Sequence, residues 1–331
     1  MPERAAGGEA PEPFFFPKPV LVMSSCLDLQ PVRYNGEIIR DDFVVKLRGF
    51  VKVVPVCPEM ALGLGTPRPR ILAHAENGAM ELFQPATGRE LTHDMAAFSE
   101  SFLEGLSGID GFLLKSKSPS CGVSGTKVYR YREGGIVLRK GRGLFAEKVL
   151  EKYYFLPAED EGRLRNRELR DNFLTNIYAA ADARVSLGRS AGMKDLVAFQ
   201  SRYKYFLMAY NQKRLRELGK LTASYKKGDD FRALVDEYRH CFLEAIRRKP
   251  SRKQLVNALT HIFGHFSDRL GGGEKAMFLK LLGSYEKGIS GIHPPLSILK
   301  SWAIRFGDKY LLSQRLLDPF PEELYEEGIS L

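Results

Sequence analysis

The chain has 331 residues, with 50 lysines and arginines against 40 aspartates and glutamates, 44% hydrophobic residues and four cysteines. This apolar fraction excludes disorder throughout, and no stretch approaches the roughly 18 apolar residues of a membrane helix, so we expect no membrane partner. Four cysteines are too few for a disulfide scaffold, and residues 1–17, an expected flexible tail, lack the apolar region of a secretory signal. We therefore expect a cytoplasmic protein with reduced thiols.

The first half of the chain alternates short apolar runs with helix-like stretches. The runs are Pro19–Met23, Phe50–Val56 and Gly111–Leu114, and the stretches are Arg40–Arg48 and Asp94–Leu106. Such alternation predicts βαβ units, in which a parallel sheet carries helices on both faces. The pattern therefore predicts an α/β, Rossmann-like domain over residues 18–185.

The second half shows helical periodicity. Four segments with apolar residues at helical spacing are expected helices: Phe231–Arg248, Arg252–Phe266, Gly273–Glu286 and Leu296–Phe306. The sequence thus predicts an all-α domain over residues 186–331 after the α/β domain.

Positive charge is concentrated in part of the second half. Residues 194–253 hold 16 basic and 7 acidic residues, a net charge of +9, whereas residues 1–157 hold 20 and 18, a net charge of +2. A concentrated basic face favours a polyanion partner, nucleic acid first. The alternative is a solvated helical surface with no partner.

Three cysteines each follow a predicted strand. Cys26 follows the first run, Cys57 the second and Cys121 the third, each in a loop sequence with serine or proline. Because the carboxyl ends of parallel strands lie along one edge of a sheet, the three thiols should converge there. Cys241 lies in a helical stretch and is expected to be a core residue.

Three converging thiolates can hold more than one kind of metal group. A structural zinc site needs four ligands, and His74 and His93 are the histidines available in the first half. A 4Fe–4S cluster normally takes four cysteines, so a cluster on three would keep one iron open as a Lewis acid. The alternative is that the cysteines are small buried hydrophobic residues.

The motifs around these cysteines resemble those of the thiouracil desulfidase family of iron–sulfur proteins. They appear in order over about residues 18–157, as Ser24–Leu27 with Val32–Gly36, then Val54–Glu59, Gly65–Pro69 and Lys115–Gly122. From about Asp195 the chain resembles the helical domain of YbgA-type proteins, through Phe199–Lys204. The fusion of the two resembles the tRNA 4-thiouridine desulfidases. Family members commonly carry glycine where this chain has Leu29.

The resemblance implies a 4Fe–4S cluster on Cys26, Cys57 and Cys121 whose open iron binds the substrate sulfur. It also implies acid–base roles for Glu59 and for Ser118 or Ser120. Replacing C=S by C=O needs water, proton transfer and a group that accepts sulfur, which a carboxylate and a thiophilic iron supply. The alternative for Glu59 is an acid that only stabilises the first turn of a helix.

Other residues carry weaker signals. Five cavity-wall or phosphate-binding candidates surround the cysteine motifs: Arg33, Tyr34, Arg68, Lys115 and Lys117. Four candidates for RNA contact lie in the helical half: Arg202, Lys204, Lys213 and Arg214. There, aromatic and basic residues alternate, as in surfaces that stack bases and hold phosphates.

The sequence therefore predicts a desulfidase that converts 4-thiouridine in tRNA to uridine, with tRNA as its partner and no obligatory protein partner. One alternative is a desulfidase of free thiouracil or thiolated nucleotides, although a small base needs no polyanion-binding surface. Another alternative is a non-catalytic RNA-binding protein with a structural metal site.

Overall fold

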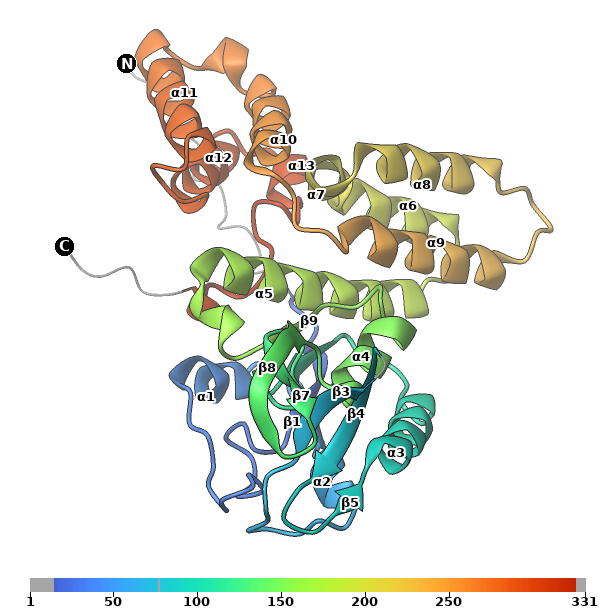
Figure 1. Cartoon of the computed structure of the whole chain (residues 1–331). Helices are drawn as coiled ribbons and strands as arrows, with labels where there is room; N and C mark the ends of the chain where they lie inside the picture. Colours follow the sequence, from blue (N-terminus) through green and yellow to red (C-terminus); the bar gives the residue numbers. More distant parts are fainter. Residues whose placement is uncertain (1–14, 77, 326–331) are drawn as a thin grey trace, which may run out of the picture. The chain divides into compact units, whose positions relative to one another are not determined.

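The computed structural model describes residues 15–76 and 78–325, which form two compact units (Figure 1). The α/β unit comprises residues 17–184 and the segment that begins at Glu322. The helical unit comprises residues 185–321 and the segment that ends at Phe16. Most of the expected flexible tail, residues 1–14, lies outside the described residues.

The main sheet of the α/β unit has four parallel strands in the order β2–β1–β6–β9. The strands are β1 (Val20–Ser24), β2 (Lys52–Val56), β6 (Gly111–Leu114) and β9 (Ala158–Asp160). Every residue of β6 is buried, as expected of a central strand with both faces covered. Three of these strands are the predicted apolar runs, and the parallel sheet confirms the predicted α/β fold class.

A second, mixed sheet in this unit was not predicted in full. Its order is β5–β4–β3–β7–β8, with β3 and β7 parallel and the other neighbours antiparallel. The strands are β3 (Leu72–Glu76), β4 (Ala79–Gln84), β5 (Arg89–Glu90), β7 (Thr126–Tyr131) and β8 (Gly134–Gly141).

Helices complete the α/β unit. They are α1 (Asp42–Arg48), α2 (Pro58–Ala61), α3 (Thr92–Glu104), α4 (Leu144–Lys152) and α5 (Arg167–Asp182), with a 3-10 turn at Arg163–Arg165. Helices α3 and α4 pack through stacked and tilted rings of Phe98, Phe102 and Phe145. Burial of such rings is among the larger apolar contributions to folding.

The chain returns to the α/β unit at Glu322. A 3-10 turn, Glu322–Leu324, buries the side chain of Leu324 to 2% exposure. Leu324 and Tyr325 line a hollow together with Phe43 and Arg170. The α/β unit is therefore built from two separate parts of the sequence.

The helical unit confirms the predicted all-α region. Its helices are α6 (Met193–Arg202), α7 (Lys204–Tyr210), α8 (Gln212–Ser224), α9 (Phe231–Ile246), α10 (Arg252–Gly264), α11 (Gly272–Glu286), α12 (His293–Arg305) and α13 (Lys309–Leu312), with a 3-10 turn at Ser267–Arg269. A π-helix, Ala183–Leu187, spans the boundary between the units. Rings of Phe199, Tyr203 and Phe242 form an aromatic core. None of the described helices is long and apolar enough to cross a bilayer.

Candidate active site

The three cysteines of the first half line one cavity of about 620 Å³ at the carboxyl edge of the main sheet. Cys26 follows β1, Cys57 follows β2 and caps the start of α2, and Cys121 lies in the loop after β6. The parallel register aligns the strand ends, with Ser24 opposite Val56. Cys241 lies on α9 in the helical unit and is not part of this cavity.

Burial controls the state of these thiols. Desolvation, followed by the nearby Cys57, raises the pKa of Cys26 to about 12. Desolvation also raises the pKa of Cys57 and that of the fully buried Cys121, although a hydrogen bond from the Ser24 side chain opposes the rise at Cys121. The free thiols are therefore neutral at pH 7, and a bound cation would be needed to stabilise their thiolate forms.

The spacing of the thiols also bears on what they could hold. Sulfurs around one zinc ion would lie about 4 Å apart, because Zn–S bonds are about 2.3 Å long. Among the side chains that the structure describes, these three sulfurs do not all lie within 4.8 Å of one another. An all-sulfur donor set is the one that iron–sulfur clusters use.

Glu59 connects the second and third cysteine loops. It lies in the first turn of α2, directly after Pro58 at the first helical position. Its Oε2 accepts hydrogen bonds from Arg68 Nη2 at 2.6 Å and Arg68 Nε at 2.9 Å, and its Oε1 accepts one from Ser120 Oγ at 2.7 Å. The carboxylate is thus fixed in orientation and directed at a hydroxyl beside Cys121.

The two candidate serines have different surroundings. Ser120 contacts Glu59 directly, and its Oγ lies 2.9 Å from Ser118 Oγ. Ser118 Oγ also accepts hydrogen bonds from the backbone N–H groups of Ser120 and Cys121, at 3.2 and 3.1 Å. Ser118 therefore shapes the loop, while Ser120 extends the hydrogen-bonded chain from Glu59.

Arg68 is a buried partner of Glu59. Its side chain is 3% exposed, and it also donates to the carbonyl oxygens of Gly65 at 2.8 Å and Val32 at 3.0 Å. All of its nitrogen atoms therefore have acceptors within the protein. This arrangement favours a role in positioning Glu59 over direct contact with a phosphate.

Tyr34 forms a wall of the cavity, as expected, together with Arg33. The guanidinium of Arg70 lies 4.7 Å from the centre of the Tyr34 ring and donates to its hydroxyl at 2.8 Å, and that of Arg33 lies 5.2 Å from the ring. Arg33 also pairs with the exposed Glu37. A flat, cation-flanked ring is a suitable surface for a nucleobase to stack on.

Lys115 and Lys117 also line the cavity, on the loop after β6. Lys115 Nζ pairs with Glu161, which additionally accepts hydrogen bonds from the hydroxyl and the backbone N–H of Ser116. Lys117 adopts a φ of +56°, which non-glycine residues rarely do. The loop is thus fixed by Glu161, which follows β9.

Sequence reasoning missed Glu161. The residue is 7% exposed and directly follows the edge strand β9, which pairs with β6. The rule that located the cysteines also applies to it, since it lies at the carboxyl end of a parallel strand. Recognising a strand of only three residues, Ala158–Asp160, was the missing step.

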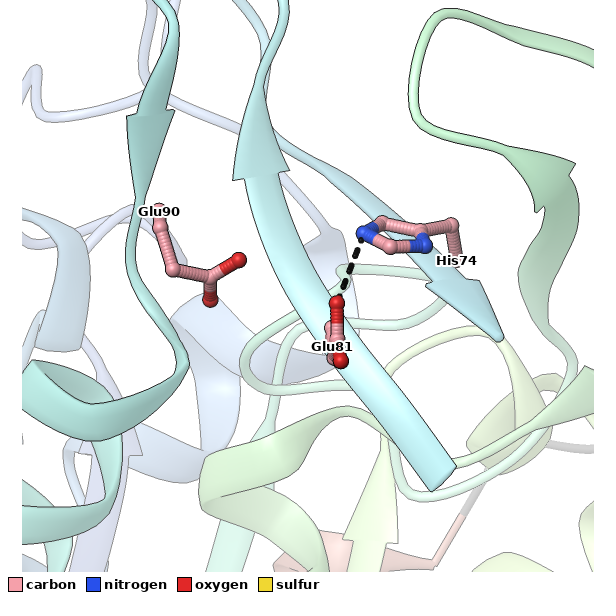
Figure 2. Close-up of side chains that lie close together, drawn as sticks. All are labelled: His74, Glu81 and Glu90. Carbon is pink, nitrogen blue, oxygen red and sulfur yellow. Dashed lines mark ion pairs between the residues drawn. The ribbon is translucent and has the colours of Figure 1, made fainter. Parts of the chain in front are cut away.

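His74, a histidine considered as a fourth ligand for the cysteine site, lies outside the cavity. His74 is on β3 of the second sheet, outside the cavity lining, and its Nε2 lies 3.3 Å from Glu81 Oε2, opposite it on β4 (Figure 2). The carboxylate of Glu90 completes a group whose ligand atoms lie within 4.8 Å of one another. Arg132 also pairs with Glu81, at 3.3 Å. His74 is not positioned as a fourth ligand beside the cysteines.

The four RNA-contact candidates in the helical unit are held to different degrees. Arg202 packs over the Phe199 ring and donates to Ser186, and Lys204 is exposed beside the Tyr205 ring. Lys213 is 87% exposed, whereas Arg214 is paired with both Glu217 and Glu244. Lys204 and Lys213 are therefore the more accessible of the four cations.

Comparison with known proteins assigns the two units to families. Residues 21–161 match the 2-thiouracil desulfurase family, and residues 204–321 match a family described as a protein of unknown function, DUF1722. The chain is 30% identical over 112 residues to the uncharacterized protein YbbK of Bacillus subtilis (strain 168), covering 31% of this chain and 73% of that one. The chain belongs to the 2-thiouracil desulfurase family through its α/β unit.

Two further relatives cover the two halves separately. The uncharacterized protein YbgA of Escherichia coli (strain K12) is 25% identical over 151 residues, which is 46% of this chain and 89% of that one. The solved structure of the 4Fe–4S-dependent thiouracil desulfidase TudS is 30% identical, covers 46% of this chain and 97% of that chain, and has a TM-score of 0.36. The family matches thus place a 2-thiouracil desulfurase domain before a DUF1722 domain in one chain.

Proposed function

We propose that the protein removes sulfur from thiolated uracil bases, and that its substrate is 4-thiouridine in tRNA. The observation that carries the proposal is a single cavity in which three cysteines lie beside a carboxylate that is hydrogen-bonded to a serine. Membership of the 2-thiouracil desulfurase family supports the reaction class. The cytoplasm, where thiols stay reduced, is the compartment that suits such a site.

The cofactor of this proposal is a 4Fe–4S cluster held by Cys26, Cys57 and Cys121. The all-thiol donor set, with Cys121 buried and Cys26 and Cys57 half-buried, fits such a group, and the fourth cysteine of the sequence, Cys241, belongs to the other unit. When bound through three cysteines, the cluster supplies one iron without a protein ligand, which can act as a Lewis acid toward sulfur.

The chain's own residues handle water and protons. In the net reaction, water adds its oxygen to C4 of the base, the C–S bond breaks, and sulfide leaves with the two protons of the water. In this proposal Glu59 Oε1 accepts a proton from the attacking water and Ser120 Oγ relays it. The hydrogen bond from Ser120 to Glu59 supports this assignment, and Arg68 holds the carboxylate in place. The Tyr34 ring offers a surface for the base.

The choice of tRNA over a free base depends on the helical unit. Its basic segment, residues 194–253, carries a net charge of +9, counted as 16 basic minus 7 acidic residues. A small thiolated base would not need such a surface, whereas a polyanionic RNA would bind to it. Free thiouracil and thiolated nucleotides are the second substrate class.

The test is anaerobic incubation of the iron-reconstituted protein with thiolated tRNA, followed by nucleoside analysis and a sulfide assay. We expect uridine and sulfide in equal amounts, and about four irons per chain. Cys57→Ser should lose iron and activity, and Cys241→Ser, the matched control, should keep both. Release of sulfide from free thiouracil but not from tRNA would favour the second substrate class. Iron-free, inactive protein would favour a non-catalytic role.

A further inference from the structure

A second cavity, of about 740 Å³, lies within the helical unit and is lined by residues of α7, α8, α9, α10 and the segment between α9 and α10. Its lining comes from the start of α8, the end of α9 and the start of α10. Five cations and one acid line it: Arg214, Arg247, Arg248, Lys249, Lys253 and Glu244. We call this cavity the basic cleft.

The single acid of the basic cleft is already neutralised. Glu244 Oε2 accepts a hydrogen bond from Arg214 Nη2 at 2.7 Å, and Arg214 also pairs with Glu217. Arg248 and Lys253 are exposed, and no carboxylate of the described residues pairs with either of them. Their charges are therefore available to a ligand that enters the cleft.

Two helix starts add to this positive potential. Helices α8 and α10 are each 13 residues long, and Gln212 and Lys253, in their first turns, line the cleft. Asn211 and Ser251 cap them by accepting from the backbone N–H groups of Arg214 and Gln254, which leaves other first-turn N–H groups without a backbone acceptor. Helix starts and unpaired cations in one concavity favour phosphate groups.

We propose that the basic cleft binds consecutive phosphates of the RNA backbone. The proposal deepens the proposed function and rests on it, because it specifies where a tRNA substrate is held. The five cations come from α8, from the segment between α9 and α10, and from α10, so a run of phosphates could contact several of them at once. Among the described residues that line the cleft, Tyr210 is the one aromatic residue, and it is 8% exposed, so its ring offers little surface for base stacking. Binding should therefore be independent of sequence.

The test measures binding of unmodified tRNA to the full chain at several salt concentrations. Arg248→Gln/Lys253→Gln should weaken binding about tenfold or more and reduce the slope of log K against log salt by about 1.8, since each phosphate contact contributes about 0.9. The matched control is Lys280→Gln/Lys287→Gln, which removes two exposed charges of the same unit outside both the cleft and the basic segment 194–253. The control should keep the affinity to within about twofold. Circular dichroism checks that both variants are folded.

The outcomes separate this proposal from the proposed function. Wild-type affinity and slope in the cleft variant, or no RNA binding by the wild-type chain, would overturn the cleft as an RNA site. Micromolar binding of inorganic phosphate or a nucleoside triphosphate that Arg248→Gln/Lys253→Gln abolishes, with RNA binding unchanged in that variant, would assign the cleft to a small anion instead. Release of sulfide from free 4-thiouridine nucleoside reports on the other unit and should be equal in all variants. If the iron-reconstituted wild-type chain releases no sulfide, the desulfidase function is contradicted, while RNA binding at the cleft is judged by the binding measurements.

Discussion

Glu59 is the residue to which the proposed function assigns proton transfer. One of its oxygens is bound by Arg68 and the other by Ser120, and its side chain is 13% exposed. The first contact fixes the orientation, and the second connects the carboxylate to the loop that carries Cys121. A residue that served only to stabilise the start of α2 would not need either contact.

We expect Glu59→Gln to keep the absorption spectrum of the cluster and to lose about 10²- to 10⁴-fold in desulfuration rate, the usual contribution of a general base. Ser120→Ala should also lose activity, because it breaks the chain of hydrogen bonds at Glu59. Ser118→Ala is the control that leaves the Glu59–Ser120 contact intact, and it should be the milder variant. Near-normal turnover in Glu59→Gln would show that the carboxylate is structural.

Removal of Arg68 should destabilise the α/β unit. Arg68→Leu would leave Glu59 buried without its cation and two backbone carbonyls without their donor, and breaking one side of a buried pair costs about 3 kcal/mol or more. Urea denaturation of the cluster-free protein measures the effect. The double variant Arg68→Leu/Glu59→Gln should recover part of the loss, and if it does not, the pair is not coupled.

At the scale of elements, the loop between β6 and β7 is the most constrained part of the site. A Cβ on Gly122 would lie 2.2 Å from Thr126 Oγ1 and 2.7 Å from the backbone oxygen of Ser118. A Cβ on Gly143, just before α4, would lie 2.4 Å from the backbone oxygen of Ser120. Both glycines thus allow the loop of Cys121 to pack against the chain that follows it.

Gly122→Ala should therefore displace Cys121 and reduce the iron content after reconstitution. Gly105→Ala is the matched control, because a Cβ there meets its nearest neighbours at ordinary contact distances of 3.6 and 3.7 Å. Iron per chain, measured for both variants, checks the expectation. If both variants bind as much iron per chain as the wild type, the loop tolerates a methyl group at position 122.

The sequence could predict the main sheet because each of its central strands is an apolar run bounded by a turn. It could also place the cysteines along one edge, since that inference needs only strand direction. The second sheet was harder to predict, because Leu72–Glu76 contains alanine, histidine and glutamate and lacks β-branched residues. The buried position of Arg68 could not be predicted, because it depends on contacts with Val32, which lies in another loop, and with Glu59, which lies in α2.

At the scale of the whole molecule, buried tyrosines should lower the free energy of unfolding at alkaline pH. Burial raises the pKa of Tyr205 to about 12 and raises those of Tyr210 and Tyr238 further. Above pH 10 the unfolded chain releases these protons while the folded chain keeps them. The free energy of unfolding should therefore fall with rising pH, by about 1.4 kcal/mol per pH unit for each such tyrosine.

Alkaline titration of the cluster-free chain checks this expectation. Ellipticity of the helices and absorbance of tyrosinate should change together above pH 10, as the helical unit unfolds. Tyr238→Phe removes one of the buried hydroxyls and should move the midpoint of the transition to higher pH. Ionisation of the tyrosines well below the loss of helix would contradict the expected coupling.

The return of the chain to the α/β unit at Glu322 affects the order in which the two units can finish folding during synthesis on the ribosome. The last described part of the α/β unit, with the buried Leu324, is synthesised after the whole helical unit. The helical unit can fold while the α/β unit still lacks this segment, since domains fold as units during synthesis. Final closure of the hollow beside Phe43 and Arg170 must therefore wait until residues 322–325 have been released from the exit tunnel. A fragment that stops before Glu322 would have an incomplete α/β unit, as the nascent chain has before this segment is released.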